Sequence, residues 1–168
     1  MVESTCLRLI TTSEQREVAE RLWQLYVHDL SEFRGYMPDG SGLYKTARLR
    51  SFFDDPDRCG YLMYRTQDLA GFALIRGLAG EMSVMGEFFV VRAARRQRVG
   101  RDAAVNAMRL HPGRWGIPFQ EENAGAARFW RRVGAEVAAA GCEEEQRYFP
   151  GRPRKPPDTW LLFSIATS

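Results

Sequence analysis

Five arginines lie within the ten residues from Arg92 to Arg101, directly after the apolar run Phe88 to Val91. A strand that ends in a basic turn and continues into a helix presents free backbone N–H groups and the positive end of the helix dipole at one point. Gly100 lets backbone approach a ligand closely there. The combination predicts an anion site for a pyrophosphate, with a solvated basic turn as the alternative. The glycine spacing matches neither a Walker loop nor a dinucleotide-binding turn.

Glu87 is the second residue whose type and place suggest chemistry, because it is a carboxylate inside the apolar run Met82 to Val91. Burial in such a strand disfavours the charged form and raises the pKa of a carboxyl group toward neutrality. A carboxylate with that pKa can act as a general base. The alternative is a residue on the solvent face of the strand.

The length and composition indicate the size of the fold, its charge and its expected location. At 168 residues and 45% hydrophobic, the chain has the size and apolar content of one domain, residues 1–168. A net charge of +3 is too small to indicate nucleic-acid binding. Three isolated cysteines and two histidines offer no metal-binding pattern and are typical of a reducing cytoplasm. No apolar run approaches the roughly 20 residues that span a membrane, so we expect a cytoplasmic protein without membrane association.

Hydrophobic periodicity predicts strands first and last with helices between them, which indicates a mixed α/β sheet. The expected strands are Cys6–Ile10, Tyr61–Arg65, Leu69–Arg76, Met82–Val91, Trp115–Phe119, one near Gln146–Phe149, and Asp158–Ile165. The expected helices are Ser13–Ser31, Ala47–Phe53, Asp102–Leu110 and Ala124–Val133, the last ending at Gly134.

Two segments of the chain match known motifs. The stretch from Glu87 to Gly100 resembles a strand leading into the motif Q/R-x-x-G-x-G/A, with Arg95 first, Gly100 last and Arg98 in place of the usual first glycine. A later segment resembles N-x-x-A-x-x-F-Y-x-x-x-G, matched by Asn123, Ala126, Phe129, Trp130 and Gly134. Together, in this order, they resemble the motifs of the GNAT superfamily of acetyl-CoA-dependent N-acetyltransferases. The run from Tyr26 to Phe33 is also similar to a poorly characterised bacterial branch of this superfamily.

The resemblance implies a GNAT fold, in which a single mixed, mostly antiparallel sheet of about seven strands has helices on both faces. Its fourth and fifth strands splay apart to bind acetyl-CoA or coenzyme A as a cosubstrate, without a metal. On this sequence the implied coenzyme contacts are Phe89, Val90 and Val91 for pantetheine, Arg95, Arg96, Gln97, Arg98, Val99, Gly100 and Arg101 for pyrophosphate, and Asn123, Phe129 and Trp130 along the coenzyme arm. The N–H of Val90 is the expected oxyanion donor. Asn123 could equally be only the N-cap of its helix.

The resemblance implies direct attack of an amine on the thioester, which needs a base and an acid. We expect Glu87 to be the base. Many members use a tyrosine as the acid, but here that position is Trp130, whose indole N–H is not a useful acid. The thiolate therefore leaves unassisted or receives its proton from Tyr148.

In this family the amine pocket is formed largely by the first two helices and the loop between them. That resemblance, with the preference of a cationic amine for aromatics and carboxylates, assigns the acceptor to Tyr26, Asp29, Glu32 and Phe33. The expected acceptor is a small-molecule primary amine. The alternatives are acetylation of a protein N-terminus or lysine, and a non-catalytic module that binds coenzyme A. Dimers are common in the family, so a homodimer is compatible with this assignment.

Overall fold

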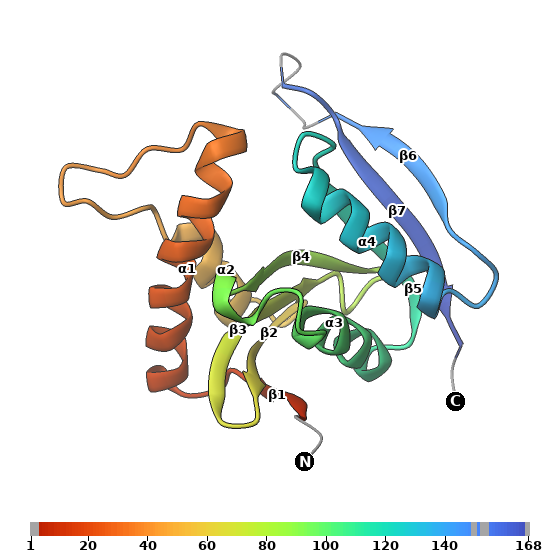
Figure 1. Cartoon of the computed structure of the whole chain (residues 1–168), viewed down its shortest axis with the longest axis horizontal. Helices are drawn as coiled ribbons and strands as arrows, with labels where there is room; N and C mark the ends of the chain where they lie inside the picture. The colour runs from red at the N-terminus through yellow and green to blue at the C-terminus, as the bar shows by residue number, and fades with distance from the viewer. Residues whose placement is uncertain (1–3, 149–150, 152–154, 167–168) are drawn as a thin grey trace.

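The computed structural model describes residues 4–148, 151 and 155–166, which form seven strands, four α-helices and one 3-10 turn (Figure 1). In chain order the elements are β1 Thr5–Leu9, α1 Ser13–Arg34, α2 Ala47–Asp54, β2 Arg58–Arg65, β3 Asp68–Arg76, β4 Ser83–Val90, η1 Arg92–Ala94, α3 Val99–Leu110, β5 Gly113–Phe119, α4 Ala124–Val137, β6 Glu143–Arg147 and β7 Asp158–Ile165.

All seven strands belong to one sheet in the order β1-β2-β3-β4-β5-β7-β6. Only β4 and β5 pair in parallel, and every other neighbouring pair is antiparallel. The prediction of a mixed, mostly antiparallel sheet is therefore confirmed. Within the described part of the chain, no helix is long and apolar enough to cross a membrane.

Helices cover both faces of this sheet, because successive side chains of each strand point to opposite sides. Phe72 and Leu74 of β3 pack with α1 and α2 in one cluster that includes Trp23. The residues between and after them, Ala73 and Ile75, pack with α3, α4 and β5 in a second cluster. The expected helices on both faces are thus confirmed.

Strands β4 and β5 separate soon after they begin. Their pairing is limited to Ser83 with Trp115 and Val84 with Gly116, so the rest of β4 has no strand on that side. Leu74 of β3 pairs with Glu87 and Ile75 with Met85, so Gly86 is an unpaired extra residue that forms a β-bulge in β4. Such a bulge bends the strand and increases its twist. This is the expected splay between the fourth and fifth strands.

The expected bounds of α4 and of β6 were wrong, each for a tertiary reason. Helix α4 continues through Gly134 to Val137, because this glycine allows close packing on β7: a Cβ placed there would lie 2.5 Å from Leu161 Cδ2. The strand expected near Gln146–Phe149 is β6, which pairs with β7 along its whole length and starts earlier than predicted, in the acidic run at Glu143. Charged side chains are usual on such an edge strand, and the predicted end at Phe149 lies outside the described residues.

Candidate active site

A cavity of about 520 Å³ lies where β4 and β5 separate. In Figure 1 helix α1 and helix α4 stand on opposite sides of β4, and residues of both helices line the cavity, together with residues of α2 and of β3 to β7. Both faces of the splayed sheet contribute, including Glu87 and Trp160 from one side and Phe88 and Trp130 from the other. The cavity therefore connects the two sides of the sheet.

Glu87 is buried at this cavity, with 5% of its surface exposed. Tyr26 donates its hydroxyl hydrogen to Glu87 Oε2 at 2.5 Å, and the Arg48 guanidinium forms an ion pair with Oε1. Burial raises the pKa of Glu87 above its ordinary value, although Arg48 and Tyr26 act in the opposite direction. The carboxyl group thus has the environment of a base that can be protonated nearer neutral pH.

Tyr26 is the residue of α1 that contacts this carboxylate. Burial, and then the negative charge of Glu87, raise the pKa of the Tyr26 phenol well above its ordinary value. The phenol therefore keeps its proton and remains a donor to Glu87. Its ring packs against Trp23, Phe72 and Phe89, which fixes the position of the hydroxyl group.

The edge of β4 that faces the splay presents backbone groups. The N–H of Val91 bonds to Ala70 O of β3 at 2.8 Å, and successive amides of a strand point to opposite edges. The N–H groups of Val90 and Phe88 therefore point away from β3, toward the splay. On the same edge the Val90 carbonyl accepts a hydrogen bond from Arg95 Nε at 2.8 Å.

Helix α3 begins inside the basic turn, at Val99 rather than at the expected Asp102. Its N-cap residue Arg98 makes no side-chain cap, and the first helical hydrogen bond runs from Asp102 N to Arg98 O. The amides of Val99, Gly100 and Arg101 precede that bond and point out of the helix end. Helices α1 and α4, by contrast, begin with side-chain caps from Thr12 and Asn123. The open start of α3 is therefore suited to an anion.

Arg98 occupies the position where the motif has a glycine, and its backbone adopts the left-handed conformation, with φ 65°. Arg96 does the same, with φ 62°. Glycine enters this region without steric cost, whereas a residue with a Cβ is strained there. The turn thus keeps a glycine-like backbone although the glycine has been replaced.

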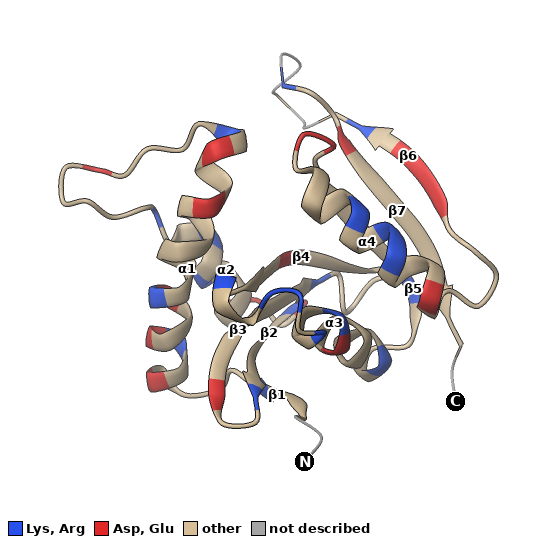
Figure 2. Cartoon of the chain, in the orientation of Figure 1, with Lys and Arg blue, Asp and Glu red and all other residues tan. Residues whose placement is uncertain are grey.

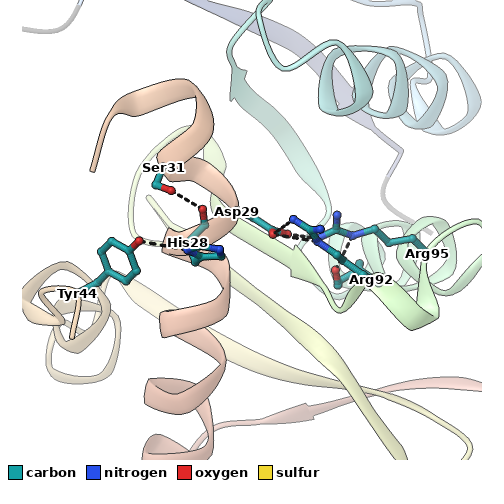
Figure 3. A network of polar contacts seen from close by, with 7 residues as sticks. His28, Asp29, Ser31, Tyr44, Arg92 and Arg95 are labelled. Carbon is teal, nitrogen blue, oxygen red and sulfur yellow. Dashed lines mark hydrogen bonds and ion pairs between the residues drawn. The ribbon is translucent and has the colours of Figure 1, made fainter. Parts of the chain in front are cut away.

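The arginine side chains around the turn have different partners. Arg92 and Arg95 both reach across to Asp29 of α1, as Figure 3 shows. Burial would raise the pKa of Asp29, but the hydrogen bonds from Arg95 and Arg92 outweigh it and lower the pKa. Arg101 pairs with Asp102 and Glu136 of the helices. The basic turn as a whole is visible as the blue segment that leads into α3 (Figure 2).

The structure brings some of the expected acceptor residues to the cavity and not others. Tyr26 lines it. Asp29 instead accepts hydrogen bonds from Arg92 and Arg95. Neither Glu32 nor Phe33 is among the lining residues. The reason is the helical period, since Tyr26, Leu30 and Arg34 share the face of α1 toward the cavity. Asp29 therefore has a structural partner where an amine contact was expected.

The remaining expected residues lie near the splay. Asn123 caps α4 by accepting from Ala126 N at 3.2 Å, and it also lines the cavity. Phe129 stacks on Phe88 with ring centroids 5.8 Å apart, and Trp130 meets Phe88 edge-on at 5.0 Å. Tyr148 lines the outer part of the cavity with 65% of its surface exposed. Gln97 of the turn bonds through its side chain to Ala93 O at 2.7 Å.

Sequence reasoning missed a set of cationic side chains on the cavity wall, contributed by Arg34, Arg48, Arg76, Arg147 and Lys155. They come from separate parts of the chain, so no local motif could reveal them. Arg34 and Asp158, 124 positions apart, form a buried ion pair at 2.6 Å. Tertiary structure alone brings these groups together.

The chain belongs to the acetyltransferase (GNAT) family, whose family model matches residues 17–135. Solved structures with the same fold include an acetyltransferase from Thermus thermophilus, with 16% identity, a TM-score of 0.67 and coverage of 95% of this chain and 97% of that one. A spermidine N-acetyltransferase from Vibrio cholerae in complex with CoA and spermine has 11% identity, a TM-score of 0.63 and coverage of 96% and 95%. An aminoglycoside acetyltransferase in complex with coenzyme A has 13% identity, a TM-score of 0.65 and the same coverage. No curated protein matches the sequence significantly.

Proposed function

We propose that this protein transfers the acetyl group of acetyl-CoA to a primary amine of a small molecule by direct attack. The observation that supports this most strongly is the combination of three features along one stretch of the chain: β4 carries the buried Glu87, its edge toward β5 is open, and the uncapped start of α3 follows it. The open edge and the helix start suit an extended, anionic coenzyme, and Glu87 suits proton removal from an amine. The three free cysteines agree with a cytoplasmic location.

The coenzyme-binding part of the proposal uses the backbone. The amides of Val90 and Phe88 can pair with the pantetheine arm as a further strand would, and the Val90 N–H can stabilise the oxyanion of the tetrahedral intermediate. The amides at the start of α3 hold the pyrophosphate, with Arg96, Arg98 and Gln97 beside them. Gly100 keeps this path open, since a Cβ there would lie 3.1 Å from Val90 Cγ2 and 3.6 Å from the Phe129 ring.

The proton transfers use side chains of the cavity. Glu87 accepts one proton of the ammonium group, so that the neutral amine attacks the thioester carbon. The carbon–sulfur bond then breaks, and the nitrogen loses its second proton to solvent as the amide forms. Tyr148 donates a proton to the leaving thiolate, or the thiolate leaves unassisted. Trp130 has no part in proton transfer and instead packs against Phe88.

The cavity favours a small acceptor, because about 520 Å³ is the size of a small-molecule site. The test is mass spectrometry of reactions that contain acetyl-CoA and a panel of amines, amino acids and peptides. We expect acetylated small amines with the parent protein and greatly reduced product with Glu87→Gln. Product only with peptides would favour a protein substrate, and binding of coenzyme A without any product would favour a non-catalytic module.

A further inference from the structure

The charges on the cavity wall are unbalanced. Five cationic side chains and two carboxylates line the cavity, and both carboxylates already have partners. Asp158 pairs with Arg34 at 2.6 Å, with 8% of each side chain exposed, and Glu87 pairs with Arg48. Three cations of the lining are left over, contributed by Arg76, Arg147 and Lys155.

Two of these cations share one aromatic ring. The guanidinium of Arg147 lies 4.3 Å from the centre of the Trp160 ring, and that of Arg76 lies 5.7 Å from it. Arg147 also contacts Glu145, a neighbour on the exposed edge strand β6. No carboxylate within the described residues forms an ion pair with Arg76, so of the two guanidinium groups beside Trp160 the one of Arg76 is the less compensated.

The third cation, Lys155, also lies against an aromatic ring of the lining. Its ammonium group lies 5.9 Å from the centre of the Tyr36 ring. Within the part of the chain that the structure describes, no carboxylate pairs with it. The cavity lining thus combines guanidinium, ammonium and aromatic groups.

Arg76 is half-buried at the end of β3, and its surroundings disfavour its charge. Burial lowers the pKa of Arg76, and the nearby Arg48 and Arg58 lower it further, while Glu87 and Asp57 act in the opposite direction. A partly desolvated cation beside other cations is stabilised by an anion that enters the same space. A ligand with such an anion would therefore be favoured at this position.

We infer that the acceptor amine also carries an oxyanion, a carboxylate or a phosphate, which binds at Arg76 and Arg147 while its amine faces Glu87. This inference rests on the proposed function and narrows its substrate class. A polyamine or another multiply cationic acceptor would bring like charges to this wall, which opposes binding. The aromatic side chains of Trp160 and Phe119 in the same lining suit an apolar body between the two charged ends.

The test compares acceptors that differ only in the anion. One pair is L-phenylalanine and 2-phenylethylamine, which differ by a carboxylate, and the other is phosphoethanolamine and ethanolamine, which differ by a phosphate. We expect the anionic member of at least one pair to have a kcat/KM about 10-fold or more above that of its partner, mainly through KM, as one charge-assisted contact supplies. The pair that shows the preference identifies the oxyanion.

Variants assign the preference to the cationic wall. Arg76→Gln and Arg147→Gln should reduce the ratio within the preferred pair to about 3-fold or less. A parental midpoint of urea unfolding shows that the variants are folded. Arg21→Gln is the matched control, because Arg21 lies on the exposed face of α1 and forms an ion pair with Glu17 there, and it should leave the ratio unchanged.

The inference and the proposed function fail in different ways. If the amines without an anion react as well as their partners, or if neither variant changes the ratio, the inferred oxyanion site is wrong, but the proposed acetyltransferase activity is still supported. If no amine of a broad panel is acetylated, the proposed function fails. In that case, calorimetry of L-phenylalanine and 2-phenylethylamine with the CoA-loaded protein tests the oxyanion site without any reaction. The inference is supported if L-phenylalanine binds more tightly and Arg76→Gln abolishes this difference. Equal binding of the two compounds, or no binding, overturns it.

Discussion

Glu87 is a buried carboxylate with two neighbours of different kinds. Arg48 favours its ionised form by charge, and Tyr26 favours it by a hydrogen bond, whereas burial favours the protonated form and prevails. Tyr26 keeps its own proton because of the same burial. A base in this setting can hold an amine proton during the reaction and still release it to solvent afterwards.

Replacing Glu87 by glutamine tests its assignment as the base. The amide keeps the shape of the side chain and can still accept a hydrogen bond from Tyr26, but it cannot take a proton. We expect kcat to fall on the order of 10²- to 10⁴-fold, with coenzyme binding unchanged and the acidic limb of the pH profile lost. Glu17→Gln, on the exposed face of α1, is the control. Near-parental kcat with the same acidic limb would place the base elsewhere.

The same carboxyl group should make folding stability depend on pH. Its pKa in the folded state lies above the ordinary value of 4.5, so the folded protein binds the proton more tightly than the unfolded chain. The resulting stabilisation is present below the unfolded pKa and is lost as pH rises through the folded pKa. We therefore expect the free energy of unfolding of the parent, relative to Glu87→Gln, to decrease with rising pH in that window. Parallel curves from urea unfolding at several pH values would contradict the raised pKa.

Arg98 is strained where the family motif has a glycine. An L-residue in the left-handed region destabilises the fold by roughly 1–2 kcal/mol. Glycine removes this strain, but it also loses more conformational entropy on folding, so only part of the strain energy is gained. We expect Arg98→Gly to raise the free energy of unfolding by about 1 kcal/mol. Arg98→Ala removes the same charge but keeps the Cβ, so it should give no gain. Equal effects of the two substitutions in urea unfolding would show that the backbone conformation is not the cause.

At the scale of elements, helix α4 is held close to β7 by Gly134. A Cβ at this position would meet Leu161 Cδ2 at 2.5 Å and Cys142 Sγ at 3.1 Å. At Gly125, in the first turn of the same helix, the nearest atom to such a Cβ is Asn123 Oδ1 at 3.8 Å. Comparing alanine substitutions at the two glycines therefore distinguishes the effect of helix propensity on stability from the effect of packing.

Alanine at these two glycines should have opposite effects on stability. Overpacking costs about 1–3 kcal/mol and the better helix propensity of alanine returns about 1 kcal/mol, so Gly134→Ala should destabilise the protein by about 1 kcal/mol. Gly125→Ala gains the propensity without the clash and should be neutral or stabilising. Denaturant unfolding measures both, and a stabilising Gly134→Ala would show that α4 can move away from β7.

The elements around the coenzyme site could be predicted from the sequence because their signals are local. The apolar run of β4, the basic turn and the motif ending in Gly134 each lie within a few residues, so their order identified the fold. The start of α3 at Val99 was missed because Arg98 is a poor sequence signal for a left-handed N-cap. The strand β6 was predicted near Gln146–Phe149, but its acidic start at Glu143 was not, because pairing with β7 outweighs the acidic composition.

At the scale of the whole molecule, the acceptor side of the cavity could not be predicted. Its charged groups come from α1, α2, β3, β6 and the segment before β7, and their positions depend on how the two halves of the sheet diverge. Asp29 illustrates the difficulty, because its type suits an amine but its helical face directs it to Arg92 and Arg95 (Figure 3). Residue types suggested a pocket for a cation, whereas the assembled wall is cationic.

Stability measured against coenzyme A concentration tests most directly whether the splay binds the coenzyme. The amides of β4 and α3 converge only in the folded state, so coenzyme A should stabilise that state by about 2.7 kcal/mol at 100 times its dissociation constant. The effect should weaken with added salt, because charges that are partly exposed hold the phosphates. We predict a progressive rise in the unfolding midpoint as coenzyme A is added. An unchanged midpoint at millimolar coenzyme A, in low salt, would contradict coenzyme binding at the splay and the acetyl transfer proposed from it.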